Sequence, residues 1–284
     1  MSESLTGTPQ RPVVIKIGGS VLTGKRAFAK AARWLLQTHG ASGPLGLSAP
    51  LIVVVSAEQG LTDRLWREAL AITPSPDARA RDLLWSTGEL RSAAMLALHL
   101  QAQGVAARAL SVHETGIRAG ARGLRVRTRC ITRALEAHAV VVVPGFLGVS
   151  EAGEVVSLGR GGSDLSAVAL ASAVSARACE LVKDVPGYFE TDPNVDAAAR
   201  HVPALTFDAA IARAAAGCPL VQADALSLAR DADLRVVIRA ASGDPRITVV
   251  HNHADQIQTV VSTEGEDADG IRYEDDPRRT AVGA

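Results

Sequence analysis

Hydrophobic residues in this chain gather in short runs, mostly β-branched, that alternate with longer segments of helical spacing. Such runs predict buried strands. They cover residues 12–17, 51–57, 105–110, 139–146, 180–183, 234–239 and 246–250. Helical spacing covers residues 26–40, 60–71, 206–216 and 222–231, and a helix-like run follows residue 161. Residues 77–103 are mostly helix formers, which the sequence "STGEL" is expected to interrupt.

Strands separated by helices of ten or more residues imply right-handed βαβ units. The predicted fold is therefore α/β, a three-layer αβα sandwich around a mainly parallel central sheet. Residues 12–250 contain no long linker and no internal repeat, so we expect one domain there. Residues 1–11 are expected to form a flexible N-terminal tail. The acidic residues 251–284 are expected to form a loosely ordered C-terminal tail.

Composition narrows the class of protein. Hydrophobic residues make up 47% of the chain and aromatic residues 3%, which predicts an aliphatic core typical of buried parallel strands. The 30 basic and 30 acidic side chains balance, which argues against a nucleic-acid partner. The N-terminus lacks the apolar region of a secretory signal, and "AHAVVVVPGF" is too short to span a bilayer. We expect no membrane partner.

Three cysteines, Cys130, Cys179 and Cys218, lie far apart without a CxxC spacing. They predict buried free thiols in a reducing, cytoplasmic protein rather than a disulfide or a metal site. The segment 113–130 holds five arginines and little periodicity. It predicts an exposed excursion or an edge hairpin, with an anion clamp as the alternative.

Three polar, glycine-containing turns follow predicted strands. They are "KIGGS" (16–20), "SAEQGLTD" (56–63) and "SLGRGGSD" (157–164). The carboxyl ends of parallel strands are where open α/β sheets bind ligands. Glycines let backbone N–H groups approach a phosphate, and Lys16 would bring a positive charge to the same oxygens. The first turn alone could be only a turn, and Ser56 or Thr62 could be only a helix cap.

The third turn combines opposite charges with backbone freedom at the start of a helix. Arg160 offers a planar fork for a carboxylate, and Asp164 could hold Mg²⁺ or position a lysine. The alternative is a salt bridge between these two residues that caps the helix. Glu89, beside a glycine in "STGEL", could bind a substrate amine if buried, although a solvent-facing glutamate is the common case.

The motifs "VVIKIGGS", "VVVSAEQGLTDRL", "STGEL", "VVPGFLG", "SLGRGGSDLSA", "LVKDVPGYFETDPN" and "GCPLVQADALSLARDADLRVVIR" resemble, in order and spacing, those of the aspartate kinases. These belong to the amino acid kinase superfamily, and the resemblance covers residues 13–250. It implies the amino acid kinase fold and ATP-dependent phosphorylation of the β-carboxylate of L-aspartate to 4-phospho-L-aspartate, with Mg²⁺. It also implies a homodimer in the cytoplasm.

The resemblance also implies a role for each matching position. Lys16 would be catalytic at the phosphates, and Asp164 would organise Lys16. The implied substrate-binding residues are Ser56, Thr62, Glu89, Phe146, Arg160, Gly161 and Gly162, with Glu89 on the substrate ammonium and Arg160 on its α-carboxylate. The implied nucleotide-binding residues are Gly18, Gly19, Ser20, Lys183, Asp184, Tyr188, Asp192, Pro193 and Arg200. No protein metal ligand is implied.

The chain departs from the resembled family at four points. "KIGGSVL" replaces the usual "KFGGTSV", Lys183 stands where a threonine is common, and Arg200 lies where a nucleotide-binding lysine is typical. Too few residues follow the predicted domain for a pair of ACT-type regulatory domains, so we expect no built-in feedback control. The alternatives are a related kinase acting on a different amino acid or carboxylate, and a ligand-binding homologue without catalysis.

Overall fold

The computed structural model describes residues 11–40, 49–121, 123–193, 195–196, 198–218 and 220–253. Residues 1–10 and most of the predicted C-terminal tail, residues 254–284, lie outside the described residues. In the described part of the chain, no helix is long and apolar enough to cross a membrane.

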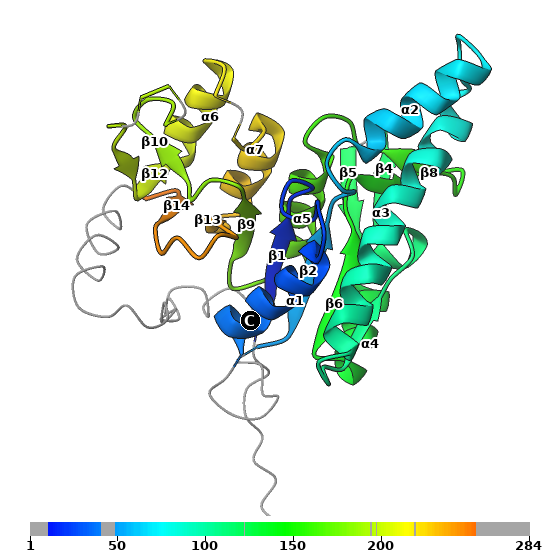
Figure 1. Cartoon of the computed structure of the whole chain (residues 1–284), viewed down its shortest axis with the longest axis horizontal. Helices are drawn as coiled ribbons and strands as arrows, with labels where there is room; N and C mark the ends of the chain where they lie inside the picture. Colours follow the sequence, from blue (N-terminus) through cyan, green and yellow to red (C-terminus); the bar gives the residue numbers. More distant parts are fainter. Residues whose placement is uncertain are drawn as a thin grey trace, which may run out of the picture.

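An eight-stranded sheet forms the centre of the molecule, in the order β12-β14-β13-β9-β1-β2-β6-β3 (Figure 1). Its strands are β1 (Val13–Ile17), β2 (Leu51–Val55), β3 (Ala107–Ala109), β6 (Val140–Pro144), β9 (Cys179–Lys183), β12 (Ala204–Thr206), β13 (Val236–Ala240) and β14 (Ile247–His251). All neighbours are parallel except β13 and β14. The mainly parallel sheet expected from the sequence is therefore confirmed.

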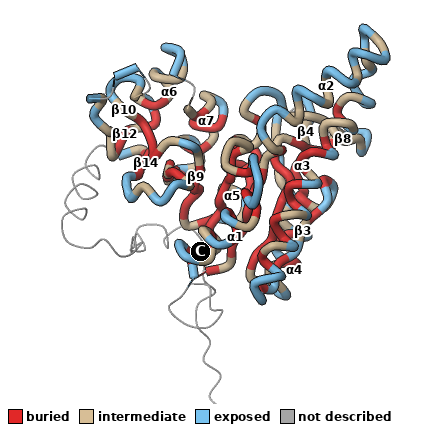
Figure 2. The backbone as a smooth tube through the Cα atoms, in the orientation of Figure 1, coloured by how far each residue is buried: buried red, intermediate tan, exposed pale blue. Residues whose placement is uncertain are grey.

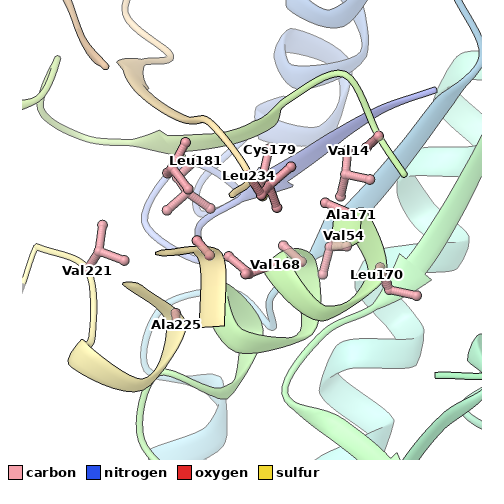
Figure 3. Close-up of a cluster of buried hydrophobic side chains, with 14 of the residues drawn as sticks. Val14, Val54, Val168, Leu170, Ala171, Cys179, Leu181, Val221, Ala225 and Leu234 are labelled. Carbon is pink, nitrogen blue, oxygen red and sulfur yellow. The ribbon is translucent and has the colours of Figure 1, made fainter. Parts of the chain in front are cut away.

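Helices cover both faces of this sheet because residues within each strand alternate between two cores. One core joins Ile15, Val53 and Val142 to α1 (Ala27–His39) and α3 (Ala78–Gln101). The other core joins Val14, Val54 and Leu181 to α4, α5, α6 and α7. Figure 3 shows part of this second core, and Figure 2 shows the buried strands between more exposed helices. The bounds of these helices are α4 Arg129–Ala137, α5 Gly162–Ala173, α6 Phe207–Ala215 and α7 Ala223–Asp231.

Smaller sheets complete the fold. A four-stranded sheet has the order β5-β4-β7-β8, and β10 (Tyr188–Phe189) pairs with β11 (His201–Val202). The strands of the four-stranded sheet are β4 (Ile117–Gly120), β5 (Gly123–Val126), β7 (Leu147–Val149) and β8 (Val155–Ser157), and the short 3-10 helix His113–Thr115 precedes β4. The arginine-rich segment is thus the edge hairpin that the sequence favoured, in which Arg118 and Arg125 face each other across the strands.

The expected interruption at "STGEL" is wrong, since α3 runs through it without a break. Glycine is needed at position 88 because a larger side chain would collide with the residues packed against it. A Cβ at this position would lie 3.1 Å from the Cβ of Ala57 and 3.2 Å from a methyl group of Leu61. The glycine therefore lets α3 pack closely against the start of α2 (Leu61–Ile72) without ending the helix.

The expectation of three buried thiols is correct only for Cys179. This residue begins β9 and lies in the core, whereas Cys130 and Cys218 are exposed. Cys130 lies in the first turn of α4 and Cys218 lies beyond the end of α6. Both of these cysteines therefore lie on the surface of the molecule, one on a helix and one in a loop, where the thiol stays exposed to solvent.

Candidate active site

A cavity of about 280 Å³ opens at the carboxyl ends of β1 and β9, beside the N-terminus of α5. This is the edge at which open α/β sheets bind ligands. Its lining is formed by Lys16, Thr62, Glu89, Phe146, Gly161, Gly162, Ser163, Asp164, Lys183, Leu220 and Gln222. Residues from widely separated parts of the chain therefore share one cavity.

Asp164 holds two lysines in this cavity. The Nζ atom of Lys16 lies 2.9 Å from Oδ1 of Asp164, and the Nζ atom of Lys183 lies 2.7 Å from Oδ2. The Asp164 side chain is 6% exposed, and those of Lys16 and Lys183 are 8% and 14% exposed. Although burial opposes ionisation, the two ammonium groups hold the pKa of Asp164 below its ordinary value.

The sheet register explains why the two lysines meet. Strands β1 and β9 are parallel neighbours, with Lys16 opposite Leu181 and Ile17 opposite Val182, so that Lys183 follows one residue further along β9. Helix α5 begins at the same edge, and Asp164 lies in its first turn. A carboxylate is also favoured there by the helix dipole.

Glu89 is the second buried carboxyl group of the cavity. The residue is 3% exposed, and its Oε2 atom has no hydrogen-bond partner in the described structure. Burial raises the pKa of Glu89 to about 8, although a backbone hydrogen bond from Ala57 and the charge of Lys16 act in the opposite direction. A buried carboxyl with a free oxygen that faces a cavity is suited to binding an ammonium group.

Gly161 shapes the start of α5. It has a φ of 75°, and a Cβ at this position would lie 2.1 Å from Cγ of Gln222. The left-handed conformation and the close contact both favour glycine. Gln222, Leu220 and Ser163 line the cavity but were not identified from the sequence. Ser163 lies inside the motif "SLGRGGSD", which could have signalled it.

Phe146 forms another part of the wall. It has a φ of 66°, which is uncommon for a residue with a bulky side chain. Its ring lies 5.9 Å from that of Trp85, one helical turn before Glu89 on α3. The structure therefore places Phe146, for which the resemblance implies a substrate-binding role, among the residues of this cavity.

The glycine turn after β1 lies against the loop after β2. A Cβ on Gly19 would lie 2.3 Å from the carbonyl oxygen of Ala57, and the same position on Gly18 would lie 3.6 Å from Nζ of Lys16. The Gly19 carbonyl accepts hydrogen bonds from Gln59 N and Thr23 Oγ1. Gly18 thus lies beside the lysine, although Gly18, Gly19 and Ser20 do not line the cavity.

Arg160 is not brought into the cavity. It is exposed, whereas Asp164 is bound to the two lysines, and no salt bridge between Arg160 and Asp164 is found in the described part of the chain. Arg160 lies between Gly159 and Gly161, both with positive φ, and this turn places it on the surface. Ser56, half-buried at the end of β2, also lies outside the lining. The structure therefore does not assemble the predicted carboxylate clamp.

Most residues predicted to hold the nucleotide lie outside the cavity. Tyr188 is 1% exposed and belongs to the hydrophobic core, so the predicted contact of its side chain with a nucleotide is wrong. Arg200 is exposed and binds Glu190 at 3.1 Å. Asp184 and Asp192 are exposed and Pro193 is half-buried, all on the segment after β9. Lys183 alone of this group lines the cavity.

No cluster of three or more histidine, cysteine, aspartate or glutamate side chains among the described residues could hold a metal ion. Of the two carboxyl groups that line the cavity, that of Asp164 is already bound to two lysines. The donor set of the cavity therefore suits an anion better than a bare cation.

A family model described as the amino acid kinase family matches residues 11–240, most of the chain. The chain belongs to the amino acid kinase family. The mainly parallel sheet between helical layers is the fold of an amino acid kinase domain, as the sequence motifs implied.

Among amino acid kinases, the chain is similar to several aspartokinases. It is 35% identical over 237 residues to the aspartokinase of Geobacillus stearothermophilus, which covers 82% of this chain and 57% of the relative. It is 40% identical over 185 residues to that of Thermus thermophilus, covering 63% and 46%. The solved aspartate kinase of Synechocystis matches with a TM-score of 0.76 and 33% identity, over 85% of this chain and 40% of the other.

More distant solved structures share the fold alone. Aspartokinase III of E. coli, in complex with aspartate and ADP, matches with a TM-score of 0.70 at 22% identity, over 85% of this chain and 65% of the other. The chain spans a little more than half the length of the first curated relatives that it matches, between 56% and 58%.

Proposed function

We propose that this protein is an ATP-dependent kinase that phosphorylates the β-carboxylate of L-aspartate to give 4-phospho-L-aspartate. The observation that carries the proposal is the joint presence, in one cavity, of a lysine–aspartate–lysine cluster and a buried Glu89 whose Oε2 atom has no hydrogen-bond partner. The first suits a phosphoryl group, and the second suits the ammonium group of an amino acid. The similarity to aspartokinases at 32–40% identity supports aspartate as that amino acid.

The reaction needs charge neutralisation and positioning more than proton transfer. A carboxylate oxygen of aspartate attacks the γ-phosphorus of ATP, an O–P bond forms, and the bond from that phosphorus to the bridging oxygen of ADP breaks. The attacking oxygen carries no proton at neutral pH, so no general base is required. The negative charge of the transferring group would be stabilised by Lys16, which Asp164 holds in place.

The substrate amino acid would bind with its ammonium group on Glu89. The α-carboxylate would bind Arg160 if its exposed side chain turns towards the cavity, while Thr62, Phe146 and the Gly161–Gly162 backbone line the pocket, and Ser56 borders it. The ammonium group binds the ionised carboxylate of Glu89 more strongly than the uncharged form. Binding of the substrate therefore favours ionisation of Glu89. This pairing would select an amino acid over a simple diacid.

Mg²⁺ fits this proposal as an ion that arrives on the phosphates of ATP. Mg²⁺ in kinases is held largely by substrate phosphates with few carboxylates, so the proposal requires no cluster of protein ligands. When bound, it would neutralise charge on the phosphate oxygens. The Gly18–Gly19 turn, Ser20, Asp184, Asp192, Pro193 and Arg200 are proposed to border the nucleotide outside the cavity.

The test is product formation. Purified protein with ATP, Mg²⁺, L-aspartate and hydroxylamine should yield aspartyl hydroxamate, and a panel with glutamate and N-acetylglutamate should show the preference for aspartate. Preferred turnover of another acid would replace aspartate as the substrate. Nucleotide and aspartate binding by calorimetry without ADP release for any acid would show a ligand-binding homologue.

We further propose that the domain acts as a cytoplasmic homodimer, as the family resemblance implies. Light scattering coupled to size exclusion measures the mass in solution. A mass of one chain, 29.5 kDa, at all accessible concentrations would rule out the dimer.

A further inference from the structure

Lys183 lies in the cavity beside Lys16, where its ammonium group can act on a phosphate. Its Nζ atom lies 2.7 Å from Asp164, whose other carboxylate oxygen binds Lys16. Lys183 lines the same cavity as Glu89 and the first turn of α5. The two oxygens of the Asp164 carboxylate therefore hold both lysines at the wall of one cavity.

The charges of the cluster do not cancel. Two ammonium groups share one carboxylate, and the remaining acidic group of the lining, Glu89, is held largely uncharged by burial at neutral pH. The cavity thus carries an excess of about one positive charge. Burial lowers the pKa of Lys183, and the positive charge of Lys16 lowers it further. An anion between the two lysines relieves this repulsion.

In this conformation, the side chain of Arg200 does not supply a second positive charge to the cavity beside Lys16. Arg200 is exposed, and its guanidinium group is occupied by Glu190 at 3.1 Å. The sequence shows a lysine at position 183, where the resembled family has a threonine, and an arginine at position 200, where that family has a lysine. The two differences are complementary. The lysine at position 183 adds a cation to the cavity, whereas the cation at position 200 lies outside it.

We propose that Lys183 is a second catalytic lysine of this protein, which binds the terminal phosphates of the nucleotide together with Lys16 and replaces the cation that Arg200 does not provide. The inference rests on the proposed phosphoryl transfer. It predicts that the two lysines flank the transferring group, while Asp164 keeps them at a fixed separation.

The substitution Lys183→Met keeps the length of the side chain and removes its charge. Loss of a hydrogen bond between charged groups, here an ammonium and a phosphate, costs about 1.5 to 3 kcal/mol, which is about 10- to 150-fold in affinity. We expect a loss of this size for ATP and for inorganic tripolyphosphate in calorimetry, little change for AMP, and a larger fall in kcat than rise in KM for aspartate. Lys183→Thr, with the family's residue, should behave in the same way.

The matched control is Lys30→Met, the same change at an exposed lysine on α1. It should leave tripolyphosphate binding and turnover within about twofold of the wild type. Thermal unfolding of each variant shows whether the fold is kept. Arg200→Met tests the competing assignment, and a large loss of tripolyphosphate binding there, with none in Lys183→Met, would overturn the proposal.

The binding arm separates this inference from the proposed function. If the wild type makes no acyl phosphate but binds tripolyphosphate through Lys183, the aspartate kinase assignment fails while the phosphate role of Lys183 stands. If Lys183→Met weakens AMP and ATP by the same factor, Lys183 contacts the nucleoside and the inference is wrong, whatever the activity.

Discussion

The ammonium group of Lys16 lies 2.9 Å from Asp164 Oδ1, although Lys16 belongs to the first strand and Asp164 to a helix more than half the described chain later. The contact is almost fully buried. Removal of the carboxylate would leave the buried cations without a counter-charge, which makes Asp164 central to both stability and the proposed chemistry.

Asp164→Asn should therefore lower the free energy of unfolding by about 3 to 5 kcal/mol, because two buried ammonium groups lose their carboxylate. Turnover should fall by at least about a hundredfold. Urea unfolding and the hydroxamate assay measure the two effects. Glu190→Gln, which breaks the exposed pair with Arg200, is the control and should change stability by less than about 1 kcal/mol. Equal effects of the two substitutions would contradict the central role of Asp164.

The pKa of Glu89, about 8 in the unliganded protein, predicts how aspartate binding depends on pH. An ammonium group binds the ionised carboxylate, so binding must release the proton of Glu89 at pH values below 8. Affinity should rise by about tenfold per pH unit from pH 6 to 8 and level off above 8. Calorimetry in buffers of different ionisation enthalpy measures the released proton. Glu89→Gln should abolish this dependence, and a pH-independent affinity in the wild type would refute it.

The same group affects stability. The folded protein keeps the proton on Glu89 at pH values where the unfolded chain, with its ordinary pKa of 4.5, has released it. Glu89 therefore lowers stability progressively as the pH rises from 4.5 to about 8, with a slope of at most about 1.4 kcal/mol per pH unit. The stability of Glu89→Gln relative to the wild type should grow across this window. Urea titrations at several pH values measure it, and a difference that shrinks would contradict the buried pKa.

Gly161→Ala should disturb the start of α5. The added methyl group lies on a left-handed residue and collides with Gln222, which adds about 1 to 3 kcal/mol of overpacking to a conformational cost of about 1 to 2 kcal/mol. Gly159→Ala is the matched control, because it shares a positive φ but has open space around it. The difference between the two variants isolates the contact with Gln222. Gly161→Ala combined with Gln222→Gly should recover that part, because it removes both Cγ and Cβ of residue 222, which would lie 2.1 and 2.8 Å from the added methyl group. A loss no larger than that of Gly159→Ala would argue against the contact.

Thiol chemistry should distinguish the three cysteines. Cys130 and Cys218 are exposed, whereas Cys179 lies in the core and burial raises its pKa well above the ordinary range. We expect two thiols to react quickly with a disulfide reagent in the native protein and the third to react only after unfolding. Serine variants at Cys130 and Cys218 assign the two fast phases. A fast third phase would show that β9 opens in solution.

The mainly parallel sheet and the helical layers were predicted from periodicity, because a strand buried on both faces must be apolar and a helix that packs on a sheet must carry its apolar residues on one side. The order of the strands came only from the structure. The motifs at the carboxyl edge could be recognised from the sequence because parallel strands bring their carboxyl ends to the same edge of a sheet. The cavity residues Leu220 and Gln222 carried no such pattern, whereas Ser163 lies within one of these motifs. Contacts between them depend on how the loop before α7 folds against α5.

The sequence by itself determined the α/β architecture, the resemblance to aspartate kinases and the place of Lys16 and Asp164 at the edge of the sheet. The burial of Glu89 in the same cavity came from the tertiary structure. Only the tertiary structure decided that Lys183 joins Lys16 on Asp164 and that Arg160 does not enter the cavity. The position of a residue along the chain determines which strand it follows. The direction and burial of its side chain depend instead on the register of the strands and on the neighbouring turns. Lys183 points at Asp164 because of the β1–β9 register, whereas Arg160 is exposed because two left-handed glycines flank it.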